Sequence, residues 1–213
     1  MAGTRKAFAE TEYQAAVAKY QAEWSTLDSV HYRLCREYPH HTELSSVFAK
    51  VLIIGRTYST GVQRQLKKGE TISEVAKLFV DQHKTMDNLL AALPSVRERL
   101  DGQSLRSVVE VHGHVVALLK PITRRSRSTR AFVAKYLHFH NPIVPIYDSY
   151  ANSNLTALRQ WTDAYKVFEE PENADREYMW YVMRLLSLFN ELINQRLQPT
   201  VRHLDYYLLT MGD

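Results

Sequence analysis

The chain has 213 residues and a formal charge of +4, from 27 basic and 23 acidic residues. This length suits one large domain or two small ones, which can bury a core without a disulfide or metal to hold it. The single cysteine, Cys35, excludes an intrachain disulfide and any zinc or iron–sulfur site built on four cysteines of this chain. We therefore expect a reducing, cytoplasmic setting.

Turn-forming residues and long apolar runs are both scarce. The chain has 7 glycines and 7 prolines, where about 15 and 11 would be average for its length. This scarcity argues against an all-β sandwich or barrel with many tight turns. The longest apolar run, Tyr178 to Met183, has six residues, whereas a membrane-spanning helix needs about 18. No apolar stretch follows residues 1–6, so we also expect no signal peptide.

The charges are unevenly distributed along the chain. Residues 1–110 carry 15 basic and 13 acidic groups, residues 111–147 carry 6 basic and no acidic groups, and residues 148–213 carry 6 basic and 10 acidic groups. The central excess of positive charge suggests an anionic partner.

Apolar residues at three- and four-residue steps predict an all-α fold of about ten helices with short loops. The first two expected helices cover about 6–24 and 25–38, and the next three begin after Thr42, Thr71 and Ser104. A further helix covers 130–140, and another begins at Asp148. The last two cover about 175–197 and run from Pro199-Thr200 to Thr210. Thr71 and Glu74 have the spacing of a capping box, and Ser104 is the expected cap of its helix. We expect one helical domain over 1–213, with possible subdomains 1–110 and 111–213 and the active site between them.

Residues 128–151 are the most informative segment. They read Ser-Thr-Arg-Ala-Phe-Val-Ala-Lys-Tyr-Leu-His-Phe-His-Asn-Pro-Ile-Val-Pro-Ile-Tyr-Asp-Ser-Tyr-Ala. This order of basic loop, helix, proline-bounded stretch and aspartate resembles the helix-hairpin-helix DNA glycosylases. Ala-Lys-Tyr-Leu-His-Phe-His-Asn-Pro and Pro-Ile-Tyr-Asp-Ser look more narrowly like bacterial proteins grouped with the 8-oxoguanine-glycosylase fold, among which one acts in phage defence on glucosylated hydroxymethylcytosine.

The resemblance implies that Asp148 is the catalytic carboxylate. Cleavage of an N-glycosidic bond builds positive charge on the sugar, and a nearby carboxylate stabilises this charge or activates water. A helix N-terminus helps to keep such an aspartate ionised. Read from the residues alone, Asp148 is an N-cap; the two roles are compatible, because each can use a different oxygen.

Many glycosylases of this superfamily carry an imine-forming lysine at the start of the preceding helix, where this chain has Ser128-Thr129-Arg130. Lys135 lies further along and would need a neutral amine to act as the nucleophile. Its alternative roles are a phosphate contact or a long side chain that covers apolar surface. The departure favours a monofunctional enzyme that uses water.

The glycines that hold a phosphate in the superfamily hairpin are missing between Gly113 and the end of the segment. The basic loop offers other candidate DNA contacts, namely Lys120, Arg124, Arg125, Arg127, Ser128 and Arg130. Cationic side chains bind phosphates with an affinity that falls steeply with salt. A second acid-free stretch, residues 44–69, would flank the bound duplex if it shares a face with the loop. Two alternatives to a DNA-binding loop are that the basic loop is only a solvated surface and that the hairpin of the superfamily is missing from this chain.

Base excision requires a pocket for the flipped nucleotide. The candidate pocket residues are His138, Phe139, His140, Tyr147 and Tyr150. Tyr147 and Tyr150 are favoured because they flank Asp148, although aromatic residues of this kind are often core.

No metal, cofactor or phosphate-loop motif is present. His112 and His114, like His138 and His140, are two residues apart, which on a helix directs them to different faces. Cys35 is expected to be a buried thiol rather than a nucleophile.

Three functions remain open. The first is a monofunctional DNA glycosylase that acts as a monomer on double-stranded DNA and removes a glucosylated cytosine or an oxidised purine. The second is a non-catalytic DNA-binding protein or a subunit of a defence complex. The third is a glycosylase with lyase activity through Lys135.

Overall fold

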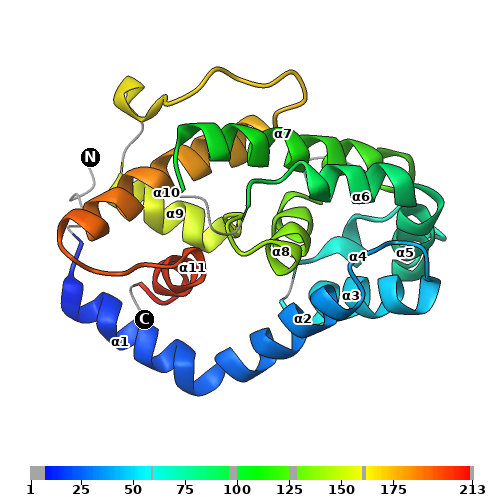
Figure 1. The fold of residues 1–213 in the computed structure, drawn as a ribbon, viewed down its shortest axis with the longest axis horizontal. Helices are drawn as coiled ribbons and strands as arrows, with labels where there is room; N and C mark the ends of the chain where they lie inside the picture. The colour runs from blue at the N-terminus through cyan, green and yellow to red at the C-terminus, as the bar shows by residue number, and fades with distance from the viewer. Residues whose placement is uncertain (1–7, 59, 96–99, 125–128, 160–161, 212–213) are drawn as a thin grey trace.

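A computed structural model describes residues 8–58, 60–95, 100–124, 129–159 and 162–211, and it is all-helical over these ranges (Figure 1). The α-helices are α1 (Glu10–Glu23), α2 (Ser25–Glu37), α3 (Leu44–Thr57), α4 (Val62–Gln65), α5 (Ile72–Asp81), α6 (His83–Ala91), α7 (Gly102–Leu118), α8 (Arg130–His140), α9 (Ser149–Leu158), α10 (Arg176–Asn194) and α11 (Val201–Thr210). Short 3₁₀ helices, η1 (Lys120–Ile122) and η3 (Asp163–Tyr165), stand in two of the connections. The all-α prediction is confirmed. Across the described ranges, no helix combines the length and apolar character that a membrane crossing requires.

Side-chain caps explain where several helices begin. Asp148 caps α9 by accepting a hydrogen bond from the backbone of Tyr150, and Thr200 caps α11 in the same way. The expected role of Ser104 is wrong, because Asp101 caps α7 and Ser104 is its capping-box partner. The expected capping box at Thr71 is also wrong, since Thr71 precedes α5 without a side-chain cap bond.

Helix α8 forms the centre of the fold (Figure 1). Residues on nearly every face of this helix are buried, including the polar Arg130, Lys135 and His138. Phe132, Val133, Ala134 and Leu137 are fully buried. α8 packs against α2, α3 and α7, while α9 packs against α10 and α11. The α8–α9 junction therefore lies where these two groups of helices meet.

Helix α7 continues without a break through residue 110, the boundary between the two possible subdomains. One continuous hydrophobic core takes residues from α1 to α11. Gly113 lets the 169–175 segment cross α7 closely, because a Cβ at this position would lie 1.9 Å from the Asn173 carbonyl oxygen. One of the few glycines is thus required where a connecting segment crosses a helix.

Candidate functional site

The segment between α8 and α9 holds Asp148 in a fixed position. The Asn141 side chain ends α8 by accepting a hydrogen bond from the Ile143 backbone and donating one to the Pro94 carbonyl. The Pro145 carbonyl accepts a hydrogen bond from the Tyr178 hydroxyl at 2.7 Å. Because Ile143, Val144 and Ile146 are buried, this extended segment is anchored along its length and delivers Asp148 to the start of α9.

Asp148 lies beside Lys135. Its Oδ1 accepts the capping hydrogen bond from the Tyr150 backbone at 2.9 Å, and its Oδ2 lies 3.5 Å from the Lys135 ammonium. The Asp148 side chain is 22% exposed and that of Lys135 is 6% exposed. The structure thus joins the two residues that the sequence singled out for chemistry, with the carboxylate on the solvent side of the pair.

A buried polar network lies behind this pair. The Lys135 ammonium also donates to the Tyr58 carbonyl at 3.1 Å. The Tyr58 hydroxyl donates to Asp28, and the Arg202 guanidinium donates to Asp28 at 2.6 Å and to Asp205. Tyr20 donates a further hydrogen bond to Asp28 at 2.8 Å. We call Tyr20, Asp28, Tyr58, Arg202 and Asp205 the Asp28 network.

Burial controls the ionisation of the neutral groups in and around this network. It raises the pKa of the Tyr20 and Tyr58 hydroxyls, and the charge on Asp28 raises both further. Burial lowers the pKa of His31, whose Nδ1 donates to the Tyr58 hydroxyl. These three side chains are therefore neutral at pH 7. Burial also raises the pKa of the Asp205 carboxyl, and the charge of the neighbouring Arg202 opposes this rise.

Arg130 differs from its expected role as a DNA contact. Its side chain is buried, with the guanidinium paired with Asp175 at 2.8 Å and with Glu177 at 2.8 Å. It also lies 5.0 Å above the Tyr147 ring. Acidic residues at the start of α10 are thus paired with the Arg130 guanidinium and connect α8 to α10.

The two favoured tyrosines have different surroundings. Tyr147 is buried, and its hydroxyl donates to Glu177. Tyr150 is 75% exposed and follows Asp148 on the first turn of α9. Only Tyr150 presents an open ring beside the carboxylate for stacking.

The other candidate pocket residues lie deeper in the fold. Phe139 is buried against Tyr32 and Tyr58. His138 is fully buried; its Nδ1 donates to the Val144 carbonyl and its Nε2 accepts from Tyr32, while burial lowers its pKa to about 4. His140 stacks on His41, and burial keeps its pKa well below the usual value.

The two histidines border different cavities. His138 lines a cavity of about 340 Å³ together with Asp28 and Arg202 of the Asp28 network. His140 lines another cavity, of about 580 Å³, with Cys35 and Asp87. The five expected pocket residues therefore do not form one chamber.

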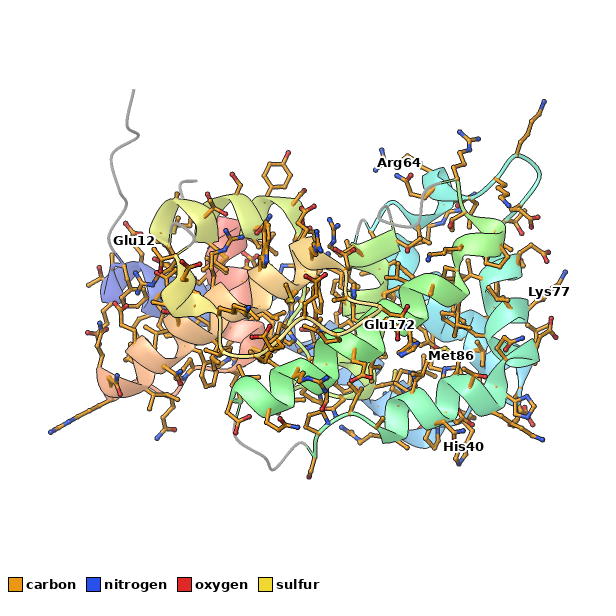
Figure 2. The ribbon with its side chains drawn as sticks, turned by 90° about the horizontal axis from the view of Figure 1, so that it is seen from above. Glu12, His40, Arg64, Lys77, Met86 and Glu172 are labelled. Atoms are coloured by element: carbon orange, nitrogen blue, oxygen red, sulfur yellow. The ribbon has the colours of Figure 1, made fainter. Side chains whose placement is uncertain are left out.

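Two acid-free stretches of the sequence meet on one surface. The backbone of Leu66 pairs with that of Thr123, the Lys67 amide donates to the Ile122 carbonyl at 2.9 Å, and the Arg124 amide donates to the Gln65 carbonyl at 2.8 Å. The exposed cations on these segments, which we call the basic face, are Arg64, Lys67, Lys68, Lys120 and Arg124. Arg64 and the yellow α9 lie along the same upper edge of the molecule in Figure 2. Arg125, Arg127 and Ser128 fall outside the described residues.

Metal-ligand groups are dispersed. No cluster of three His, Cys, Asp or Glu side chains that could hold a metal occurs in the described ranges. Cys35 is a buried thiol, and burial raises its pKa to about 12, so it is a poor nucleophile.

Asp205 and Tyr58 are the site neighbours that the sequence analysis missed. A usable signal existed for Asp205, which shares the apolar stripe of α11 with Val201, Leu204 and Leu208. A charge on such a stripe indicates a buried, paired group. Tyr58 contributes its backbone carbonyl, which has no signature in the sequence.

Comparisons of the chain with protein-family models, curated proteins and solved structures find no match.

Proposed function

We propose that the protein is a DNA glycosylase in which Asp148 promotes cleavage of the N-glycosidic bond of a modified base. The observation that carries this proposal is the Lys135–Asp148 pair, whose partly exposed carboxylate faces solvent at the start of α9. The helix-hairpin-helix resemblance of residues 128–151 assigns the same aspartate.

The chemistry suits a carboxylate at a helix N-terminus. As the bond between the sugar C1′ and the base nitrogen breaks, its electron pair leaves with the base and positive charge develops on the sugar. The Asp148 carboxylate stabilises that charge. Water then forms the new bond to C1′, its proton goes to the departing base, and an abasic site remains.

The basic face supplies a route for the duplex. Its cations come from two segments that the backbone joins directly, and no acidic residue interrupts either segment. Lysine and arginine bind phosphates without sequence preference and so place the duplex rather than select a base. Here these side chains take the part that glycine amides have in the superfamily hairpin.

Lys135 favours hydrolysis over lyase chemistry. An imine-forming lysine must be a neutral amine, whereas the ammonium of Lys135 is paired with Asp148 at 3.5 Å and donates to the Tyr58 carbonyl. We therefore propose a monofunctional enzyme. The substrate is double-stranded DNA with a modified base, for which a glucosylated cytosine and an oxidised purine are the two classes suggested by the resemblance.

A base-release assay with an isosteric variant tests the proposal. The purified protein is incubated with duplexes that contain 8-oxoguanine or glucosylated hydroxymethylcytosine, and mass spectrometry identifies the released bases while alkali reveals abasic sites. Asp148→Asn should lower the rate by about 100-fold or more, although asparagine keeps the helix cap. Wild-type rates in this variant, or no release from either DNA, would contradict the proposal.

A second candidate is a DNA-binding protein without a catalytic step. It is favoured by the engagement of both Asp148 oxygens, one by the Tyr150 amide and the other by Lys135. If this second function is correct, the protein should bind DNA through the basic face with an affinity that falls with salt. It should release no free base in the same assay.

A further inference from the structure

Tyr150 is the most exposed of the large hydrophobic residues in the described ranges, at 75%. It stands on the first turn of α9, and its backbone amide donates to Asp148 Oδ1 at 2.9 Å. Among the described residues, its ring contacts no other aromatic ring and its hydroxyl makes no hydrogen bond. Single exposed apolar residues are common on protein surfaces. The position beside the carboxylate is therefore what distinguishes Tyr150.

The exposed surface of α9 carries no charge. None of its 10 residues is acidic or basic, and no acidic residue occurs between Asp148 and Asp163. An exposed helix usually carries charged residues on its outer face. This face offers hydroxyl groups, which can bind phosphates, and it has no acidic group that would repel DNA. Its exposed residues, which three- and four-residue steps place together, are Ser149, Tyr150, Ser153, Thr156 and Ala157.

Helix α9 lies along the same edge of the molecule as the basic face. Arg64 and the yellow α9 are both at the upper edge in Figure 2, whereas His40 is at the lower edge. A duplex whose phosphates bind the basic face can thus reach the start of α9, where Asp148 and Tyr150 stand. Charge complementarity therefore favours DNA as the partner of the α9 surface.

An aromatic ring at this position has a specific use when a nucleotide leaves the duplex. Flipping leaves a gap, and the bases around the gap expose apolar ring faces to water. Stacking of an aromatic side chain on such a base strengthens binding by about 5- to 150-fold. Neither Asp148 nor Tyr150 lines the cavities of His138 and His140. The Tyr150 ring is thus placed for the duplex and not for a base enclosed in one of those cavities.

We propose that Tyr150 stacks on a base that remains beside the gap when the target nucleotide is flipped out. The inference rests on the proposed function, and it moves Tyr150 from the expected pocket for the excised base to the surface that holds the opened duplex. Asp148 acts at the sugar, while Tyr150, held to Asp148 through its backbone amide, stabilises the DNA around it.

A duplex with an abasic-site analogue separates the two roles of Tyr150. The tetrahydrofuran analogue leaves a gap without a target base, so a residue that binds only the excised base has nothing to contact. Fluorescence anisotropy measures the affinity of the full-length protein for this duplex and for the unmodified duplex. Tyr150→Ala should weaken binding of the tetrahydrofuran duplex by about tenfold. Binding of the unmodified duplex should weaken by less than about twofold, because its bases remain stacked on one another.

Two further variants make the test specific. Tyr150→Phe keeps the ring and loses only the hydroxyl, so it should bind the tetrahydrofuran duplex as tightly as the wild type. Tyr38→Ala is the matched control, because Tyr38 is 49% exposed and precedes His40 by two residues, and Figure 2 places His40 at the opposite edge from α9. This control should leave both affinities unchanged.

The outcomes separate the inference from the proposed function. If the wild-type protein releases no base from either modified DNA, the proposed function is wrong. If the wild type releases base but Tyr150→Ala binds the tetrahydrofuran duplex as tightly as the wild type, only the role of Tyr150 is overturned. Equal weakening by Tyr150→Phe and Tyr150→Ala would also overturn that role, since the hydroxyl and not the ring would then make the contact. A loss in Tyr150→Ala that is absent from Tyr150→Phe and Tyr38→Ala supports it.

Discussion

The Lys135 ammonium lies 3.5 Å from the Asp148 carboxylate, although one residue belongs to the middle of α8 and the other caps α9. The same ammonium donates to the carbonyl of Tyr58 at the end of α3. Three segments of the chain thus converge on one cation. This convergence fixes the position of Lys135 and gives Asp148 an oppositely charged neighbour.

Borohydride trapping tests the role of Lys135. Because the Lys135 side-chain nitrogen is held by the Tyr58 carbonyl and lies beside Asp148, we expect the wild-type protein to release base without forming a covalent adduct to DNA. Denaturing gels of reactions run with borohydride measure the adduct. An adduct that disappears in Lys135→Ala would show that Lys135 is the nucleophile and that the enzyme is a lyase.

The salt dependence of DNA binding tests the basic face. Each phosphate contact contributes about 0.9 to the slope of log affinity against log salt. We expect the variant with Gln at Arg64, Lys67, Lys68 and Arg124 to bind DNA weakly, with a slope smaller by about 3 to 4. Fluorescence anisotropy at several salt concentrations measures the slope.

The control for the basic face removes the same charge elsewhere. Glutamine replaces four exposed lysines outside this surface, Lys19, Lys77, Lys84 and Lys166. Equal changes of slope in the two variants would show that net charge matters and that the basic face is not the DNA-binding surface.

Helix positions could be read from the sequence because the signals are local. Asp148 caps α9, as its residue type and position predict, and α11 begins directly after Pro199-Thr200, where it was expected. The capping error at Ser104 has a local cause as well. Asp101, a better acceptor, stands three residues before Ser104 and takes its place, while the Thr71 side chain makes no cap bond to α5.

The surroundings of the site depend on tertiary contacts, which the sequence did not reveal. Arg130 belongs to a basic loop in the sequence, yet Asp175 lies 45 residues away and binds its guanidinium in the fold. Arg202 and Asp28 are 174 residues apart and form a buried pair. No local pattern specifies such pairs, because each partner alone resembles an ordinary surface charge.

The close crossing at Gly113 predicts a large effect of a small substitution. Alanine favours helix over glycine by about 1 kcal/mol, but in Gly113→Ala its Cβ would meet the Asn173 carbonyl, part of the backbone. We expect a net loss of about 1–3 kcal/mol in the free energy of unfolding, measured by urea denaturation. Gly55→Ala is the matched control, because its Cβ meets the movable end of Ile72 at 2.7 Å; an equal or larger loss there would contradict this account.

Buried His112 predicts a specific loss of stability in acid. Burial lowers its pKa to about 4, and in the unfolded chain the pKa is about 6.5. Between these values the unfolded state binds the proton and the folded state does not, so stability falls as the pH drops from 6.5 towards 4. This one group should remove about 2 kcal/mol between pH 7.5 and pH 5.0.

The variant His112→Gln isolates this contribution. Glutamine can still donate to the Arg130 carbonyl, which accepts from His112 Nε2 at 3.2 Å, but it cannot titrate. Urea unfolding should show that the variant loses about 2 kcal/mol less than the wild type between pH 7.5 and pH 5.0. Between pH 7.5 and pH 9.0 the two proteins should change alike, because His112 is neutral in both states there. An equal acid loss in both proteins would mean that His112 takes up its proton in the folded state as readily as in the unfolded chain.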